Sequence, residues 1–588
     1  MALATGSERQ ELVRRQSQLR CRFGLHLEAN TSFAILFTLL AIHASILAYG
    51  SYVNAPAKDE VGHLTAGLSH LELQKFDLYR VNPPLVRTIA AIPLWLSSAK
   101  RDWSEYVSGN FGRPEFPVGR HFFKNNGPEA LKYFFLGRLV CIPFSLITMV
   151  LCYAWGKELF GRRAGIVAAG IWCFLPEAIG NGQMLTPDMG ATAVGLGLWF
   201  AFRRWLKSST WTSTLVAGAL LGLALLTKTT WLIAFPIAFL MWIATKFRSL
   251  NGRTAIQLLF IFLASIYFVN LGYLFEGTGK KLGDYSFICT KLSGETSQIP
   301  GNRFKGTWLG DVPIPLPENF VRGIDVQKYE FDEKEYDSFL DGEWRKQGWW
   351  YYYLYALLIK TPLAMVLLGG LASLQSARSL KWQNGVELLL PGAFLITFVS
   401  SQTGFNHHLR YVLPAMPYFV IWASSCMSAR NPLFRKVVAV LFCWIVASTL
   451  FATPHCHSYF NELIGGPRAG FRHLHDSNVD WGQDTFRVLH WKDGQDEIED
   501  FYFAHYCVFP LRNVMPNVLW SDIPQSENIE LQPGCYAVSV NQLNRSDGKY
   551  DVFNSFEPEH WIGYSTRVYR LSQHDIDQVS VDQKNRKN

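Results

Sequence analysis

The sequence predicts a polytopic α-helical membrane protein that carries a small soluble α/β domain at its C-terminus. Three observations predict this fold class. Of the 588 residues, 49% are hydrophobic and only 17% are charged, which is too apolar for an ordinary soluble protein. The apolar residues gather in runs about as long as a bilayer core requires. After about residue 454 these runs stop, and strand patterns replace them.

The apolar runs predict about eleven membrane helices, because each span needs roughly 20 mostly apolar residues. The first run follows several arginines, as a signal peptide would. It is too long for a signal core and no A-x-A site follows it, so we interpret it as a retained anchor. The predicted spans are residues 33–53, 133–155, 164–183, 188–206, 212–227, 229–246, 255–274, 350–372, 386–403, 409–428 and 434–453.

Basic residues predict the orientation of these helices. Lys and Arg cluster before the first span and then in every second segment between spans, and such clusters mark the cytoplasmic side. We therefore expect the N-terminus inside and the C-terminus outside. The clusters are Arg14/Arg15/Arg20/Arg22, Lys157/Arg162/Arg163, Arg203/Arg204/Lys207, Lys246/Arg248/Arg253, Arg378/Lys381 and Arg430/Arg435/Lys436.

This topology divides the chain into a cytoplasmic segment (1–32), a transmembrane domain (33–453) and an extracytoplasmic domain (454–588). Two long loops of the transmembrane domain, 54–132 and 275–349, lie outside. The inner segments are short, and the sequence has neither a Walker A nor a dinucleotide-binding glycine motif. The net charge of +8 includes no long basic tract for nucleic acid. Any activated substrate must therefore reach the outer side through the bilayer.

The first outer loop begins with NAPAKDEVGHL, in which Asp59 and Glu60 stand side by side. Residues 64–75 have apolar residues at helical spacing, which is typical of a short interfacial helix. Residues 80–99 are apolar but short and begin near Pro83-Pro84, which predicts an interfacial or re-entrant helix rather than a span. The acidic pair either faces water or performs chemistry at the headgroup level. Adjacent residues point in different directions, so we do not expect the two acids to share one task.

Other charged residues lie inside or at the predicted outer ends of the spans. Lys360 stands about a dozen residues inside an apolar run, and an intramembrane charge is functional by default. Lys228 interrupts an apolar hairpin, and Arg410 lies at the outer end of a span. Each of these two is either a snorkelling anchor or a ligand for an anionic group. Asp188 starts an apolar helix, where a carboxylate either complements the helix dipole or faces a site.

Six motifs follow one another along the membrane part and the start of the tail. They are KDEVGHLTAGLSHLELQKFDLYRVNPPLVR (58–87), NGQMLTPDMGAT (181–192), LALLTKTTW (223–231), GWWYYYLYALLIKTPL (348–363), HHLRYVLPAMPY (407–418) and YFNELIGGPRAGFRHLHDSNVDWGQD (459–484). In order and topology they resemble polyprenyl-phosphate-dependent glycosyltransferases of the GT-C superfamily. The group they resemble is the protein O-mannosyltransferase and lipid A aminoarabinose transferase type (glycosyltransferase family 39-like).

The resemblance implies that a sugar passes from a polyprenyl-phosphate carrier to a hydroxyl acceptor outside the membrane, with inversion of the anomeric centre. It implies that Asp59 is the catalytic base and Glu60 its supporting neighbour. A single displacement needs a carboxylate to take the acceptor proton and cations to stabilise the leaving phosphate. The residues expected to bind substrate are Asp188, Arg80, Asn82, Lys228, Lys360, His408, Arg410 and Tyr411.

One position departs from the pattern. Some aminoarabinose-transferase relatives have a lysine just before the proline that corresponds to Pro83, where this chain has Asn82. The phosphate contact from this loop is therefore in doubt, and Arg80 is the residue that would replace it.

The sequence predicts no required metal and no cofactor beyond the lipid-linked sugar donor, although a divalent cation stays an alternative. Two His-x-His pairs, His455/His457 and His473/His475, follow the last span, but no third ligand stands at a fixed spacing from them. The resembled group generally acts without a divalent ion. In the outer tail, Cys507 and Cys535 either pair or stay free.

Several alternatives stay open at this point. The acceptor is a protein, a lipid or a glycan, and neither the sugar nor the oligomeric state follows from the sequence. The short basic loops suit a bacterial inner membrane with its site on the periplasmic face. The C-terminal domain is either a cap over the site or a structural dock. The rival classes are a multi-pass transporter of lipid-linked substrates, for which no internal repeat is present, and a non-catalytic lipid-binding protein.

Overall fold

The structure is a computed structural model, and it describes most of the chain. The described residues are 6–107, 113–247, 251–295, 299–334, 336–376, 382–429, 431–523 and 529–579; the side chains of residues 6–29, 376, 382 and 383 are not among them. Several residues of the basic clusters lie outside this description, namely the side chains of Arg14, Arg15, Arg20 and Arg22 and the residues Arg248, Arg378, Lys381 and Arg430.

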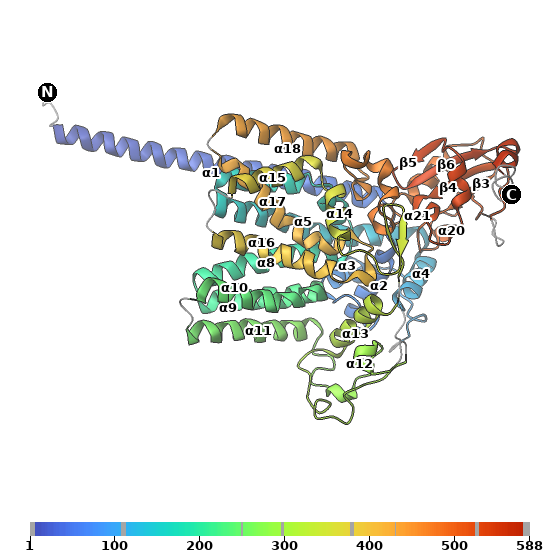
Figure 1. The fold of residues 1–588 in the computed structure, drawn as a ribbon, viewed down its shortest axis with the longest axis horizontal. Helices are drawn as coiled ribbons and strands as arrows, with labels where there is room; N and C mark the ends of the chain where they lie inside the picture. Colours follow the sequence, from blue (N-terminus) through green and yellow to red (C-terminus); the bar gives the residue numbers. More distant parts are fainter. Residues whose placement is uncertain are drawn as a thin grey trace.

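Long helices form a bundle, and a small sheet lies at one end of it, opposite the end from which α1 extends (Figure 1). This arrangement confirms the predicted fold class. The bundle helices are α1 (Gly6–Val53), α5 (Ala130–Phe160), α6 (Arg162–Cys173), α7 (Pro176–Gly182), α8 (Pro187–Lys207), α9 (Trp211–Thr227), α10 (Ala234–Lys246), α11 (Gly252–Gly272), α14 (Tyr352–Lys360), α15 (Leu363–Ser376), α16 (Trp382–Ser400), α17 (Met416–Ser424) and α18 (Pro432–Ala452).

Five helical stretches among the described residues are long and apolar enough to cross a membrane, or seven if each of two bent helix pairs counts as one span. The pairs α6–α7 and α14–α15 bend by 57° and 110°. The predicted number of about eleven is therefore not confirmed, although every predicted run contains helix. Two of the predicted spans show why they do not count as membrane-spanning helices: α17 has only nine residues, and α8 carries four charged side chains. The orientation stays a prediction.

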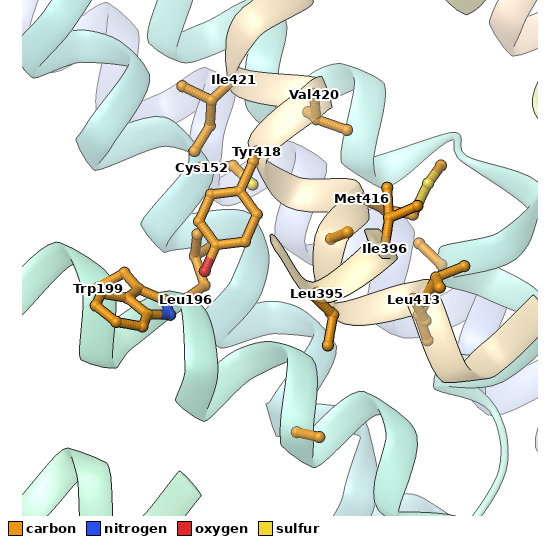
Figure 2. Packing of buried hydrophobic residues seen from close by; sticks show 14 of the residues in the cluster. Cys152, Leu196, Trp199, Leu395, Ile396, Leu413, Met416, Tyr418, Val420 and Ile421 are labelled. Atoms are coloured by element: carbon orange, nitrogen blue, oxygen red, sulfur yellow. The ribbon is translucent and has the colours of Figure 1, made fainter. Parts of the chain in front are cut away.

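The bundle is held together by one large apolar core. Buried side chains of α5, α8, α16 and α17 meet in it, and Figure 2 shows Trp199 of α8 close to Tyr418 of α17. Trp155, Trp172, Trp199 and Trp205 are each fully buried. Aromatic side chains of this size contribute large buried areas, so the core holds the helices of the bundle together.

The outer loops are folded against the end of the bundle. Their elements are α2 (Lys58–Glu72), α3 (Leu85–Trp95), α4 (Glu115–Asn126), α12 (Thr290–Ser293), α13 (Glu318–Asp332) and the hairpin β1 (Ser338–Leu340) with β2 (Glu343–Arg345). The predicted helix at 80–99 appears as α3. The other prediction needs correction, because α2 starts at Lys58 rather than near residue 64, and residues 60–70 are buried on every side instead of lying on an interface.

Close backbone contacts hold α2 and α13 in place. A Cβ atom on Gly67 of α2 would lie 2.0 Å from the carbonyl oxygen of Arg87, and one on Gly323 of α13 would lie 2.3 Å from that of Arg80. Only glycine permits these approaches. The first turn of α3 and the segment that precedes it are therefore held closely by α2 and α13.

The C-terminal residues form a small domain with a four-stranded sheet of order β3-β4-β6-β5. The pair β3–β4 is parallel, and the other pairs are antiparallel. Strands are therefore present after residue 454, as the sequence pattern predicts. Cys507 and Cys535 are both free, so they do not form a disulfide in this structure. The elements are α19 (Thr485–Asp493), β3 (Phe501–Ala504), α20 (Leu511–Val514), β4 (Gly534–Ser539), α21 (Val540–Leu543), β5 (His560–Ile562) and β6 (Thr566–Leu571).

Candidate active site

A polar cavity of about 300 Å³ lies where the outer helix ends, the two outer loops and the C-terminal domain meet. The first turn of α2 contributes Asp59, and the first turn of α8 contributes Asp188. The segment before α17 contributes Arg410, and α13 contributes Glu330. Elements from most of the chain therefore converge on one space.

A chain of ion pairs crosses the cavity. Nη2 of Arg410 donates to Oδ2 of Asp59 at 2.9 Å, and Nε of Arg410 lies 3.7 Å from Oδ2 of Asp188. Nζ of Lys228 donates to Oδ1 of Asp188 at 2.6 Å. The Asp59 side chain is 21% exposed, whereas those of Arg410, Asp188 and Lys228 are at most 9% exposed. Asp59 is thus the member most open to the cavity.

Arg410 has binding capacity that the protein itself does not use. Its guanidinium stacks on Trp481 at 3.9 Å, which fixes its plane. Among the described residues its Nη1 atom has no hydrogen-bond partner, although it is buried. A buried donor without a partner is costly, so this atom is suited to an anionic oxygen of a ligand.

Glu60 is turned away from the cavity, although it neighbours Asp59. It is fully buried and binds Arg138 through two hydrogen bonds of 2.8 and 2.5 Å. It also accepts hydrogen bonds from the backbone N–H groups of Ala57 (2.7 Å) and Leu185 (2.8 Å). The bond to Ala57 caps the helix start. Glu60 therefore lies among contacts that hold the fold around Asp59, and its expected supporting role in catalysis stays a prediction.

Two of the expected cationic ligands also lie elsewhere. Nε of Arg80 donates to Asn319 of α13 at 2.8 Å, and Arg80 does not line the cavity. Nζ of Lys360 donates to the carbonyl oxygens of His457 (3.0 Å) and Asn478 (2.5 Å). Lys360 therefore secures the loop after the last helix, and its charge is satisfied by backbone oxygens that a sequence pattern does not reveal.

The other expected site residues do line the cavity. They are Asp59, Asn82, Asp188, Lys228, His408, Arg410 and Tyr411. Asn82 is uncharged, so this position of the cavity lacks the cation that a lysine would provide. Lys228 lies 4.6 Å from the centre of the Tyr411 ring, which joins the two residues at the floor of the site.

The cavity contains further charged residues that the sequence did not single out. Arg113 binds Glu115, Glu330 on α13 at 2.9 Å and the hydroxyl group of Tyr79 at 3.2 Å. No spacing motif marks these residues, because their contacts join loops that are far apart in the chain. The other unforeseen lining residues with charged side chains are Lys58 and Lys334.

The C-terminal domain approaches the cavity through residues 476–481. Asp476 and Trp481 line it, whereas Asp480 and Asp484 point into the cap. Burial tends to raise the pKa of the Asp476 carboxyl, but the nearby charges of three histidines and Lys58 hold this pKa below its usual value. The cap therefore supplies part of the wall and one additional carboxylate.

Histidines also meet at this wall. His407 and His408 lie beside Asp476, and one ligand atom from each of the three residues lies within 4.8 Å of the others. Burial lowers the pKa of His407 to about 4 and lowers that of His408 as well. The two His-x-His pairs do not come together, since His455 binds Asp484 and His473 binds Tyr355.

An apolar groove of about 240 Å³ continues the cavity toward the bundle. Five residues line both spaces, namely Lys228, Gln327, Phe331, Phe405 and Tyr411. Beyond these, the groove is lined mainly by α13 and by the apolar ends of the neighbouring helices, including Leu232, Ile233, Ile324, Phe398 and Val399. A charged cavity that passes into an apolar groove suits an amphiphilic ligand.

Comparisons with known proteins give one family match, over part of the chain, and several structural similarities. Residues 132–273 match the family model of dolichyl-phosphate-mannose-protein mannosyltransferase. No curated protein matches the chain. Among solved structures, ArnT from Cupriavidus metallidurans bound to undecaprenyl phosphate is 10% identical, with a TM-score of 0.46, and the match covers 90% of this chain and 97% of ArnT. The archaeal oligosaccharyltransferase AglB from Archaeoglobus fulgidus is 12% identical, with a TM-score of 0.45, over 93% and 75% of the two chains.

The matched segment contains two of the six motifs, those at 181–192 and 223–231, and with them Asp188 and Lys228. It covers about a quarter of the chain and includes neither Asp59 nor Arg410. Within that range the match confirms the resemblance predicted from the motifs: this chain resembles the polyprenyl-phosphate-dependent glycosyltransferases of the GT-C superfamily.

Proposed function

We propose that this protein is a membrane glycosyltransferase that moves a sugar from a polyprenyl-phosphate carrier to a hydroxyl acceptor, with inversion, on the outer face of the membrane. One observation carries the proposal: Asp59 is held by Arg410 in a charged cavity that shares five lining residues with an apolar groove. The resemblance of the membrane segment supports the same reaction class.

The donor fits the two connected spaces. The isoprenoid chain lies in the groove, and the phosphate lies where groove and cavity share Lys228 and Tyr411. The buried Nη1 atom of Arg410 has no partner among the described residues, so it is available to a phosphate oxygen. Charge-assisted hydrogen bonds of this kind are among the strongest that proteins form. Asp188 orients both cations through its two carboxylate oxygens.

Asp59 acts as the base in a single displacement. The acceptor hydroxyl oxygen forms a bond to the anomeric carbon while its proton passes to an oxygen of Asp59. The bond between that carbon and the phosphate oxygen breaks on the opposite side, and the electron pair leaves with the phosphate. Arg410 and Lys228 stabilise the charge that develops there. Because attack and departure occur on opposite faces, the anomeric configuration inverts.

Several surrounding residues serve binding rather than chemistry. Asn82, His408 and Tyr411 line the cavity and contact sugar or phosphate. The outer location rests on the basic clusters, and the short inner loops suit a bacterial inner membrane with the site on its periplasmic side. The C-terminal domain covers the cavity and admits the acceptor, which is a protein, a lipid or a glycan.

The test is transfer by the purified full chain in lipid nanodiscs. Polyprenyl-phosphate-linked mannose and aminoarabinose are supplied with peptide, lipid and glycan acceptors, and mass spectrometry follows product and carrier release. We expect turnover with at least one pair and an inverted linkage by NMR. Mass spectrometry of the co-purifying lipid narrows the choice of donor.

The rival classes give different results in the same preparation. A transporter moves a fluorescent lipid-linked sugar across a liposome membrane without cleaving it. A non-catalytic lipid-binding protein retains the carrier and releases no phosphate. Either outcome, together with no transfer to any acceptor, would contradict the proposed function.

A further inference from the structure

We propose that His407, His408 and Asp476 form a binding site for a divalent transition-metal ion in the wall of the cavity. One ligand atom from each of these residues lies within 4.8 Å of the others. Ligand atoms around a first-row ion lie about 2.0–2.2 Å from the metal. A small inward movement of the three side chains therefore brings them to coordination distance.

The backbone at Asp476 directs one carboxylate oxygen toward the histidines. Asp476 has a φ of 55°, in the left-handed region that residues other than glycine rarely adopt. Its Oδ1 atom accepts a hydrogen bond from the N–H of Ser477 at 2.6 Å, and its Oδ2 atom lies 4.0 Å from Nδ1 of His407. The side-chain oxygen of Asn541 on α21 accepts a hydrogen bond from the N–H of Asp476 at 3.0 Å. Such unusual backbone geometry concentrates at functional sites.

The two imidazole rings are fixed by their neighbours. Nδ1 of His408 is hydrogen-bonded to the Ser477 hydroxyl at 2.6 Å. A polar partner on one ring nitrogen is usual for a ligating histidine, because it fixes the orientation of the ring. The His407 ring stacks on Phe405 at 4.6 Å, and the edge of Tyr411 meets His408 at 5.2 Å. The ligands are thus largely preorganised.

The charges around the cluster determine how strongly an ion is held. Arg410 is neutralised by Asp59 and Asp188. The positive charge of Lys58 acts on all three ligands. It would repel a bound metal ion unless the Lys58 side chain moved away. We therefore expect a moderate affinity for the metal ion, and removal of the Lys58 charge should raise this affinity.

The donor set selects a class of ion. Two imidazoles and one carboxylate suit Zn²⁺, Mn²⁺ or Fe²⁺ rather than Ca²⁺ or Mg²⁺. Three protein ligands leave at least one coordination position for water or another oxygen. The cluster faces the cavity, so that position is open to a phosphate oxygen of the donor. This role rests on the proposed function, whereas metal binding itself does not.

The experiment measures metal binding by the full chain, purified without a histidine tag and stripped with a chelator. Zn²⁺ is titrated by calorimetry, and Co²⁺ by its visible absorption, with no sugar donor present. We expect one ion per chain. His408→Gln and Asp476→Asn should each weaken binding at least tenfold, since each removes a ligand or its charge. Lys58→Met should tighten binding.

His473→Gln is the matched control, because His473 belongs to a predicted His-x-His pair and lies outside the cluster; its affinity should equal that of the wild type. Thermal unfolding without metal verifies that each variant folds, and Asn suits the left-handed conformation at residue 476. Absence of stoichiometric binding by the wild type would overturn the site, as would unchanged affinity in both ligand variants. Neither result bears on glycosyl transfer, which is measured separately.

Discussion

Two adjacent carboxylates in the first turn of α2 have opposite surroundings. Glu60 is fully buried, and its oxygens accept four hydrogen bonds, two from Arg138 and two from backbone N–H groups. Asp59 is 21% exposed and is joined by one ion pair to Arg410. A carboxylate has about four acceptor positions. Glu60 uses its full capacity inside the protein, whereas Asp59 keeps most of its capacity for the cavity.

The difference separates a residue that supports the fold from one that is available for chemistry. Arg138, the partner of Glu60, also donates to the carbonyl oxygens of Ser51, Asn54 and Ala55, so it ties the end of α1 to α2. Glu60 thereby holds the turn that presents Asp59. The two acids are linked in structure and distinct in task, and four variants test this distinction.

The largest effect is expected from Asp59→Asn. Loss of the base should lower the transfer rate by about 10²–10⁴-fold. The thermal unfolding midpoint should stay near the wild-type value, because Asp59 is partly exposed and Asn still accepts a hydrogen bond from Arg410. Initial rates and differential scanning fluorimetry measure the two quantities. Transfer at the wild-type rate would remove Asp59 as the base.

Glu60→Gln should show the reverse pattern. The buried Arg138 cation would lose its counter-charge, and breaking a buried ion pair typically costs about 3–5 kcal/mol. The unfolding midpoint should fall strongly, while the transfer rate per folded molecule stays within a few-fold of the wild type. If the rate collapses at unchanged stability, Glu60 is catalytic after all.

A third carboxylate, Asp480, shows how burial changes the pKa of an acid that has no cationic partner among the described residues. Burial, together with repulsion from Asp484 and Asp476, raises the pKa of Asp480 to about 7, whereas the unfolded chain has the usual value near 3.9. Between these values the folded state holds a proton that the unfolded state has released. Stability therefore falls as the pH rises from about 4 to about 7, by on the order of 4 kcal/mol at most.

Asp480→Asn should remove this dependence. The unfolding midpoint of the variant should change less between pH 5 and pH 8 than that of the wild type. Scanning fluorimetry of the full chain at the two pH values measures the difference. Parallel curves for the two proteins would show that Asp480 does not bind a proton on folding.

The smallest effect is expected from Arg113→Gln. Arg113 faces the cavity as Asp59 does, but it is held by Glu115 and Glu330. Removal of its charge should raise the donor KM about tenfold, which corresponds to 1.4 kcal/mol. Arg120→Gln on the exposed face of α4, the helix that begins two residues after Arg113, is the control and should leave KM unchanged. Equal KM values for both variants would show that Arg113 does not contact the donor.

The sequence predicted the parts of the site that stand at the ends of apolar runs. Asp59, Asp188, Lys228 and Arg410 were found because topology and motif resemblance both place them outside, near the membrane surface. Arg80 and Lys360 were expected there for the same reasons. Their actual partners are an amide on α13 and two carbonyl oxygens of a distant loop, and no periodicity reports such contacts.

The same limit explains the elements that sequence reasoning missed. The helix α13 lies in an outer loop whose sequence carries no apolar span, and its Glu330 reaches Arg113 across 217 positions of the chain. The start of α2 was placed too late, because the bond from Ala57 N–H to Glu60 that begins the helix depends on Arg138 holding the same carboxylate. Contacts between segments that are distant in the sequence therefore determine both the place of α13 and the start of α2.

The ion pair between Asp59 and Arg410 spans 351 positions of the chain, and this distance has a consequence for biosynthesis. Asp59 is synthesised and inserted long before its cation exists, and Asp476 follows later still. The cavity assembles only when the last helices and the C-terminal domain have been delivered. A ribosome-bound intermediate therefore has no working site, and a chain that ends before residue 476 should insert into the membrane yet stay inert.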